Sequence, residues 1–291
     1  MYRSLNDYLK EKFGTKVYKI ALSSGCTCPN RDGTIGVGGC IFCGEKGSGD
    51  FAQDGTLSIT EQLARGKEFL SSKITSGKYI AYFQSFTNTY GPPELLEQKF
   101  TEAMEDKDVV ALSVATRPDC LPQNILEMLE RLNRIKPVWV ELGLQTIHEE
   151  TAAYIRRGYS LPVFDKAVKE LKNRGIEVVV HVILGLPGES RQQMVETVRY
   201  VGNSGANGIK LQLLHVLKNT DLARDYAAGR FEVLSREEYI SIVKECVAVL
   251  PPDMVIHRLT GDGSKRDLIA PLWSTDKKRV LQEIKEALQS L

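Results

Sequence analysis

Residues 17–43 read VYKIALSSGCTCPNRDGTIGVGGCIFC, a short β-branched run followed by a glycine-rich loop that contains four cysteines. Eleven residues separate Cys28 from Cys40, and two separate Cys40 from Cys43. Thiolates are soft ligands that select zinc, copper(I) or iron–sulfur centres, and a cubane cluster with full protein ligation takes four of them. Three thiolates leave one iron open for a substrate or cofactor. The spacing therefore predicts an iron–sulfur cluster on Cys28, Cys40 and Cys43.

Two other interpretations of these cysteines stay open on the spacing alone. A structural zinc site needs four ligands and usually contains two Cys-x-x-Cys pairs. This chain has one such pair, and Cys26 can supply the fourth thiolate. A redox dithiol at Cys40 and Cys43 normally opens a helix of a thioredoxin-like unit, whereas here the pair ends a glycine-rich loop. Both patterns match the sequence less well than a cluster does.

The composition is that of an ordinary globular protein. Of the 291 residues, 42% are hydrophobic and 26% are charged, and the formal net charge of +1 favours neither nucleic acid nor membrane as a partner. No apolar run approaches the ~20 residues of a membrane span, and the N-terminus has no signal-peptide core. We expect a cytoplasmic protein without membrane association, whose cysteines serve metal or redox chemistry rather than disulfides.

Short β-branched runs alternate with segments of helical periodicity, which predicts a parallel sheet with crossover helices. The expected strands are 17–22, 79–83, 109–114, 137–144, 177–184 and 208–214, and the expected helices between them are 60–72, 93–105, 122–134, 162–173 and 190–203. The predicted fold class is α/β, a partial (β/α)6 TIM-type barrel with short N-terminal and C-terminal extensions. A seventh strand near 254–259 and a helix near 275–290 would close one side. We expect one domain over 1–291, with a core at 17–215 and an extension at 216–291.

In such barrels the chemistry lies on the loops at the C-terminal ends of the strands, and the cysteine loop follows the first strand. Glu141 interrupts the apolar run VWVELGL. Because burying a charge without purpose is costly, this favours function over a structural ion pair. In IKLQL, alternation places Lys210 and Gln212 on one face, which we expect to be internal. His181 in VVVHVI suits either a cofactor contact or a hydrogen-bonded core histidine. Cys120 and Cys246 are expected to be small buried hydrophobes.

The cysteine loop, with Phe42 before its last cysteine, and the six predicted βα units together resemble the radical S-adenosylmethionine (SAM) superfamily. The cysteine spacing is longer than the commonest one in that superfamily and is similar to its elongator-like branch, which modifies wobble uridines in transfer RNA (tRNA). The pair CPNRDGT and GGCIFC resembles a bacterial subfamily of this branch, over nearly the whole chain. Its later motifs are SFTNTY at 85–90, SVATRPD at 113–119, ELGLQT at 141–146, HVILGLPGE at 181–189, LHVLK at 214–218 and LTGDG at 259–263.

The resemblance implies a radical SAM enzyme that uses a 4Fe-4S cluster and SAM. Cys28, Cys40 and Cys43 would hold the cluster, with Cys26 as a bystander, and an external donor of the flavodoxin or ferredoxin type would reduce it. SAM would then yield a 5′-deoxyadenosyl radical. The implied substrate is tRNA, in which carboxymethylaminomethyluridine at the wobble position becomes aminomethyluridine. The implied SAM contacts are Phe42, Gln84, Ser85, Asn88, Arg117, Glu141, Gln145, His181, Leu184, Gly185 and Lys210.

Three points stay open after the resemblance. A cation at Arg117 or Lys210 can hold a carboxylate, and the sequence does not say whether that carboxylate belongs to the cofactor or to the substrate. A second candidate function is radical chemistry on a small molecule such as a porphyrin, as in a related branch. A third is a non-catalytic metal or electron-carrier protein, which would need neither an open iron nor a barrel of cofactor-binding strand ends.

Overall fold

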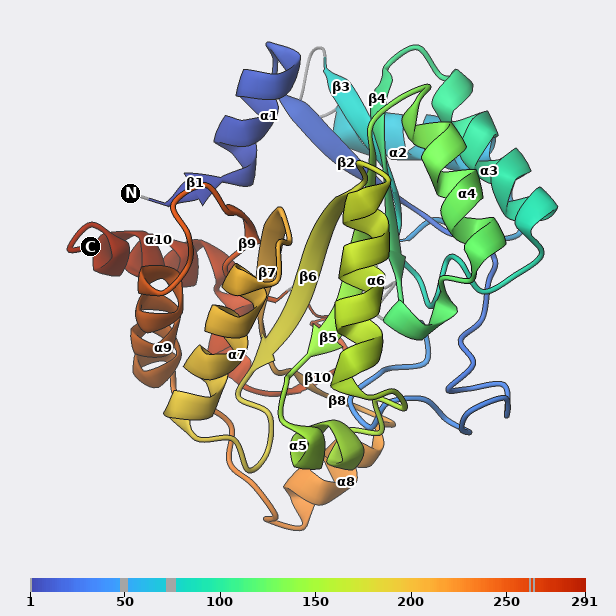
Figure 1. Ribbon diagram of the computed structural model, residues 1–291. Coiled ribbons are helices and arrows are strands. Elements are labelled where there is room, and N and C mark those ends of the chain that lie inside the picture. Colours follow the sequence, from blue (N-terminus) through green and yellow to red (C-terminus); the bar gives the residue numbers. More distant parts are fainter. Residues whose placement is uncertain (1, 48–51, 72–76, 262, 264) are drawn as a thin grey trace.

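The structure of the protein is a computed structural model that describes residues 2–47, 52–71, 77–261, 263 and 265–291. Within these residues, eight strands form one sheet in the order β1-β9-β7-β6-β5-β4-β3-β2. Every neighbouring pair in this sheet is parallel. Figure 1 shows the sheet curving, with the crossover helices wrapped around its outside. The predicted α/β partial barrel is therefore confirmed.

The strands of the predicted units begin and end close to their expected limits. They are β2 (Val17–Leu22), β3 (Lys78–Phe83), β4 (Val109–Thr116), β5 (Val138–Gln145), β6 (Glu177–Leu184) and β7 (Gly208–Leu213). The expected seventh strand is β9 (Val255–Arg258), which pairs in parallel with β7. The sequence pattern does not reveal the edge strand β1 (Arg3–Ser4) or the separate antiparallel pair of β8 (Val216–Leu217) and β10 (Leu268–Ala270), because each spans two or three residues.

The five expected crossover helices are present, each within one residue of its predicted ends. They are α2 (Ile59–Ser71), α3 (Pro93–Glu105), α4 (Gln123–Asn133), α6 (Leu161–Asn173) and α7 (Arg191–Asn203). Ser72, the last residue of the first predicted helix, lies outside the described residues. The remaining helices are α1 (Leu5–Phe13), α5 (Glu149–Tyr154), α8 (Asp221–Ala227), α9 (Arg236–Ala248) and α10 (Lys277–Leu288). None of the helices described is long and apolar enough to cross a membrane.

Local sequence signals explain where α7 begins and where α6 and α7 end. The Ser190 hydroxyl accepts a hydrogen bond from the Gln193 backbone N–H, and the Gln193 side-chain oxygen accepts one from the Ser190 backbone N–H, which forms a capping box at the start of α7. Gly175 and Gly205 follow α6 and α7 with φ of 67° and 85°. Glycine adopts this left-handed conformation without a Cβ clash, so it ends each helix at low cost.

The main hydrophobic core lies between the sheet and its helices. Phe83 and Val140 from the strands and Phe100 and Phe164 from the helices belong to it and are fully buried. Alternation along β5 then turns Glu141 to the inner face of the curved sheet. The strands therefore present an apolar outer face to the helices and a polar inner face to the interior of the barrel. Cys120 and Cys246 are buried, as expected.

Helix α1 closes the end of the barrel at which the strands begin. Its Leu9 packs in a small apolar cluster with Val17, Ile80 and Trp139 from three strands. The opposite end, where the strands finish, carries the cysteine loop and the loops that follow the other strands. The polar interior is therefore accessible from the face on which the sequence places the chemistry.

Candidate active site

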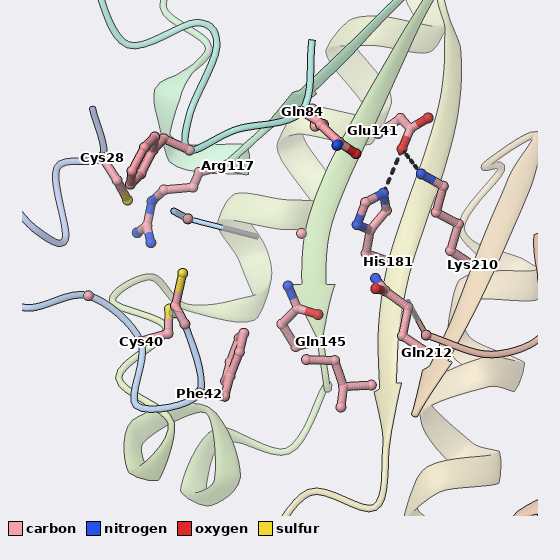
Figure 2. A pocket seen from close by; sticks show the side chains of 18 of the residues that line it. Cys28, Cys40, Phe42, Gln84, Arg117, Glu141, Gln145, His181, Lys210 and Gln212 are labelled. Atoms are coloured by element: carbon pink, nitrogen blue, oxygen red, sulfur yellow. Dashed lines mark hydrogen bonds and ion pairs between the residues drawn. The ribbon is translucent and has the colours of Figure 1, made fainter. Parts of the chain in front are cut away.

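One cavity of about 230 Å³ lies at the C-terminal ends of the strands and gathers most of the predicted site residues. These are Cys28, Cys40, Phe42, Cys43, Gln84, Arg117, Glu141, Gln145, His181 and Lys210. Figure 2 shows Cys28, Cys40 and Arg117 at one end of this cavity and Glu141, His181 and Lys210 at the other. We call these the cysteine end and the floor.

The cysteine end is a loop held by the side chains of its own CPNR motif. Arg31 donates hydrogen bonds to the carbonyl oxygens of Cys43 (2.9 Å) and Gly44 (2.6 Å). Asn30 donates one to the carbonyl of Arg156 (2.5 Å) and one to the sulfur of Cys40 (3.5 Å). These contacts fix the direction of the loop backbone, and the thiols turn into the cavity.

The donor set of this loop suits a cluster. All three thiols line the same cavity, yet no three Cys, His, Asp or Glu side chains among the described residues stand close enough to hold a single metal ion. Thiolates that surround a cavity without converging on a single ion suit a cluster of several metal atoms. Burial raises the pKa of Cys40 to about 12, helped by the neighbouring Cys43. Metal binding must therefore displace its proton.

Cys26 lies apart from the other three loop cysteines. A Cβ placed on Gly91 would stand 3.4 Å from the Cys26 sulfur, so this thiol lies beside the start of α3. Cys26 also packs against the main hydrophobic core and is not among the residues that line the cavity. The geometry is that of a packed thiol.

The floor is built around Glu141, which is completely buried. One carboxylate oxygen accepts hydrogen bonds from Lys19 (2.8 Å) and Ser113 (2.8 Å). The other accepts from His181 (2.7 Å) and Lys210, as Figure 2 shows. Lysines on strands β2 and β7 thus share one carboxylate on the strand between them in the curve of the barrel. The cost of burying Glu141 is offset by four donors.

The floor groups have strongly shifted pKa values. Burial disfavours the charged form of Glu141, but Lys19 and Lys210 outweigh it and hold the pKa well below its usual range. Burial, together with the nearby Lys210 charge, lowers the pKa of His181 to about 4, so its ring is neutral near pH 7. Burial lowers the pKa of Lys210 to about 7, although Glu141 opposes the shift. The floor therefore combines an ionised carboxylate, a neutral imidazole and an ammonium group that titrates near neutrality.

Gln145, between the two ends, is conformationally strained. It has φ of 71° at the end of β5, where the register with β6 shifts, and non-glycine residues seldom adopt this conformation. Its side chain lies in the cavity between Phe42 and His181 (Figure 2). The amide oxygen is buried and accepts no hydrogen bond from the described residues. Such strain persists only when the surroundings impose it, and it concentrates at functional sites.

Four predicted contacts do not line the cavity. They are Ser85, Asn88, Leu184 and Gly185. Asn88 donates to the carbonyls of Ser85 and Ala115 and accepts from Ser24, so it fastens the loop after β3. Leu184 is fully buried in the main core, and the Gly185 amide donates to the Met194 sulfur.

Other lining residues escape the sequence patterns. Tyr82, Arg157, Tyr159 and Arg258 all line the cavity. Lys19, which donates a hydrogen bond to Glu141, could have been found from the sequence. Alternation along VYKIAL places it on the same face of the strand as the buried Val17. Of the LTGDG motif, Gly261 and Gly263 line the cavity, and Asp262 lies outside the described residues.

Comparison with known proteins decides the family. The model described as "Radical SAM superfamily" matches residues 25–201, and the "Radical_SAM C-terminal domain" model matches residues 206–290. The chain belongs to the radical SAM superfamily. It is therefore an enzyme of a family that uses a 4Fe-4S cluster and SAM, and solved structures of the same fold contain them.

The relatives of this radical SAM chain include proteins of the elongator-like branch. It is 45% identical to the uncharacterized protein YtqA of Bacillus subtilis over 289 residues, which covers 99% of this chain and 90% of that protein. It is 29% identical over 169 residues to the tRNA uridine(34) acetyltransferase of Methanocaldococcus jannaschii, covering 57% of this chain and 30% of that protein. The structure of an N-terminally truncated Elp3 from Methanocaldococcus infernus shares the fold, with a TM-score of 0.68 at 18% identity over 90% of this chain and 63% of that one.

Proposed function

We propose that this radical SAM enzyme acts on tRNA and converts carboxymethylaminomethyluridine at the wobble position into aminomethyluridine. The observation that carries the proposal is one cavity with three thiols at one end and a buried ionic floor at the other. This arrangement supplies separate places for a cluster with SAM and for a small charged substituent of the substrate. The identity to a tRNA uridine(34) acetyltransferase supports tRNA as the substrate class.

Cys28, Cys40 and Cys43 are the proposed cluster ligands. Cys26 is left out of the proposed set, because its thiol lies beside the start of α3 and does not line the cavity. Bound there and reduced by an external electron donor, the cluster and SAM would supply a 5′-deoxyadenosyl radical. Phe42 offers an apolar face beside the thiols, which suits adenine. The unpartnered amide oxygen of Gln145 suits a hydroxyl of the ribose.

The overall reaction balances with water as the co-substrate. One hydrogen atom and one electron leave the carbon between the amine and the carboxylate of the substituent, which gives an imine. Water then adds to the imine, the carbon–nitrogen bond breaks, and aminomethyluridine and glyoxylate are released. In this balance the hydrogen atom would end in 5′-deoxyadenosine, formed together with methionine from SAM, and the returned electron would replace the one first supplied by the donor. One proton is released.

We also propose that the two matched segments form a single domain. β9, which lies in the C-terminal match, is hydrogen-bonded to β7, and β7 lies beside β6 of the N-terminal match. Strands from both segments therefore share one sheet, and separating them would expose the edge of β7 and part of the main core.

The decisive experiment compares tRNA nucleosides by mass spectrometry from cells with and without this protein. We expect carboxymethylaminomethyluridine to accumulate and aminomethyluridine with its derivatives to fall when the protein is absent. An unchanged wobble-uridine profile would exclude the tRNA proposal. Purified, cluster-loaded protein should release 5′-deoxyadenosine from SAM under reducing conditions, and failure to do so would favour an electron carrier.

A further inference from the structure

The floor of the cavity presents hydrogen-bonding groups that the ionic network leaves available. Lys210 is 2% exposed. Its ammonium donates to Glu141 and to the Tyr82 hydroxyl (3.0 Å). An ammonium group has three donor hydrogens, so one has no acceptor among the described residues. Gln212, two residues along the same strand, points into the same space in Figure 2.

We infer that this floor binds the glycine-derived group of the substrate, with its carboxylate on Lys210 and Gln212 and its amine at His181. The inference rests on the proposed function, because it names the part of the cavity that recognises that substrate. It also decides between the two carboxylates that the sequence leaves open, since it assigns Lys210 to the substrate.

The charges of the cavity favour an anion at this end. Its lining contains five arginines and lysines and one acidic residue, Glu141, among the described residues. Glu141 is shared by Lys19 and Lys210, and Arg258 is a further positive charge near Lys210, so the floor has three cations and one anion. A carboxylate bound by Lys210 would reduce this excess of positive charge, which low-polarity surroundings favour.

The other basic side chains near the cysteines are already engaged. Arg117 makes a two-pronged ion pair with Asp119 (2.9 and 2.7 Å) and lies beside Cys28 in Figure 2. Arg31 is held by two loop carbonyls. Arg157 donates to the carbonyls of Thr146 (2.5 Å) and Tyr159 (3.0 Å). Arg117 therefore lies at the cysteine end and is already paired with Asp119, whereas Lys210 lies at the opposite end of the cavity.

His181 supplies the acceptor that an amine needs. Because Glu141 is ionised and can only accept, the hydrogen of the neutral His181 ring lies on Nε2, which faces Glu141. The second ring nitrogen, Nδ1, is then an acceptor. Together the three side chains offer donors to a carboxylate and an acceptor to the adjacent N–H, which is the pattern of an N-substituted glycine. The aminomethyl product lacks the carboxylate and would lose the contact with Lys210.

The test measures binding of three anticodon stem-loop RNAs to the cluster-loaded enzyme at pH 6.5. The RNAs carry carboxymethylaminomethyluridine, its carboxamide, or aminomethyluridine at the wobble position. We expect the wild type to prefer the carboxylate over the carboxamide roughly tenfold to hundredfold, as for a hydrogen bond to a charged group. Lys210→Met should abolish this preference, Lys210→Arg should restore part of it, and Lys169→Met on the exposed face of α6 should leave it intact.

The same variants separate this inference from its alternatives. SAM affinity is measured in parallel, and a loss of SAM binding in Lys210→Met as large as the loss of RNA preference would assign Lys210 to the cofactor and overturn the inference. Retention of the full preference in Lys210→Met, or in Gln212→Leu if the lysine variant does not fold, would overturn it too. If the wild type converts the carboxylate RNA but binds the carboxamide equally well, the inference fails and the proposed function stands. If it neither prefers nor converts that RNA, the proposed function itself fails.

Discussion

The two ends of the cavity are built in different ways. The cysteine end is one continuous loop. Arg31 holds the carbonyls of Cys43 and Gly44 from within it, and contacts of Asn30 and Ile41 with Arg156 and Ile155 fasten it to the chain after α5. The floor is assembled from separate strands. Glu141 meets Lys19, His181 and Lys210, which lie 122, 40 and 69 residues away along the chain.

The geometry of the two ends is therefore fixed by different interactions. A loop that must close around a cluster tolerates thiols that are only partly buried, because the metal itself supplies much of the order. A floor that must orient a small charged group cannot rely on a ligand, so its side chains stand on adjacent parallel strands and are locked by ion pairs before anything binds. Variants at the two ends should therefore fail in different ways.

Cys28→Ala should produce the largest effect, because two thiolates cannot hold a cluster that leaves one iron open. Anaerobic reconstitution should load about four irons per chain in the wild type and only traces in the variant. The measurement is iron and sulfide analysis with the visible absorption spectrum. Cys26→Ala is the matched control and should load normally. The reverse pattern would show that Cys26, and not Cys28, is a ligand.

Glu141→Leu should destabilise the fold rather than prevent cluster loading. The change leaves Lys19 and Lys210 without their shared carboxylate, and breaking a buried ion pair costs about 3–5 kcal/mol. Denaturant unfolding of the cluster-free protein measures this loss. Adding Lys210→Met should recover part of it, since the second change removes a stranded charge. A loss below about 1 kcal/mol would mean that water already screens the floor.

The cysteine end can be predicted from the sequence more completely than the floor, because it is one continuous loop and the floor is assembled from separate strands. The ligand spacing and the glycine-rich loop are local, so the cysteine end can be found without knowing the fold. Glu141 and Lys210 are recognisable as inward-facing polar residues, but their meeting depends on register, in which His181 is opposite both Gly143 and Lys210. No local pattern encodes that register. The same limit explains why Asn88 proves to fasten a loop instead of lining the cavity.

The pH dependence of the free energy of unfolding tests the protonation state of Lys210 in the floor. Lys210 has a pKa of about 7 in the folded protein against about 10.5 when unfolded, so between these values the unfolded chain binds more protons and stability rises with pH. The slope approaches 1.4 kcal/mol per pH unit, or about 2 kcal/mol between pH 7.5 and 9. Lys210→Met should lack this gain.

Groups facing Lys210 do not confuse this measurement. Glu141 is ionised throughout, His181 is neutral above its pKa of about 4, and burial holds the pKa of Tyr82 well above its usual range. Lys19 and Arg258 are further charged groups near Lys210, and burial holds the pKa of the nearby His257 well below its usual range, so this ring is neutral as well. Parallel stability curves for the wild type and Lys210→Met would show that Lys210 stays charged throughout this interval, and the floor would then be more strongly cationic.

Gly39→Ala should give the smallest effect and confine it to the cysteine end. Gly39 has φ of 86°, and a Cβ there would stand 2.9 Å from Nε of Arg31, the side chain that holds Cys43 and Gly44 in place. The strain is on the order of 1–2 kcal/mol, so a chelator should remove iron from the variant roughly tenfold faster. Gly14→Ala, at the end of α1 with φ of 68° and open space around it, carries the same backbone strain far from the loop. It should lower unfolding stability without changing iron release. Equal iron release from both variants and the wild type would mean that the cluster, and not Arg31, sets the shape of the loop.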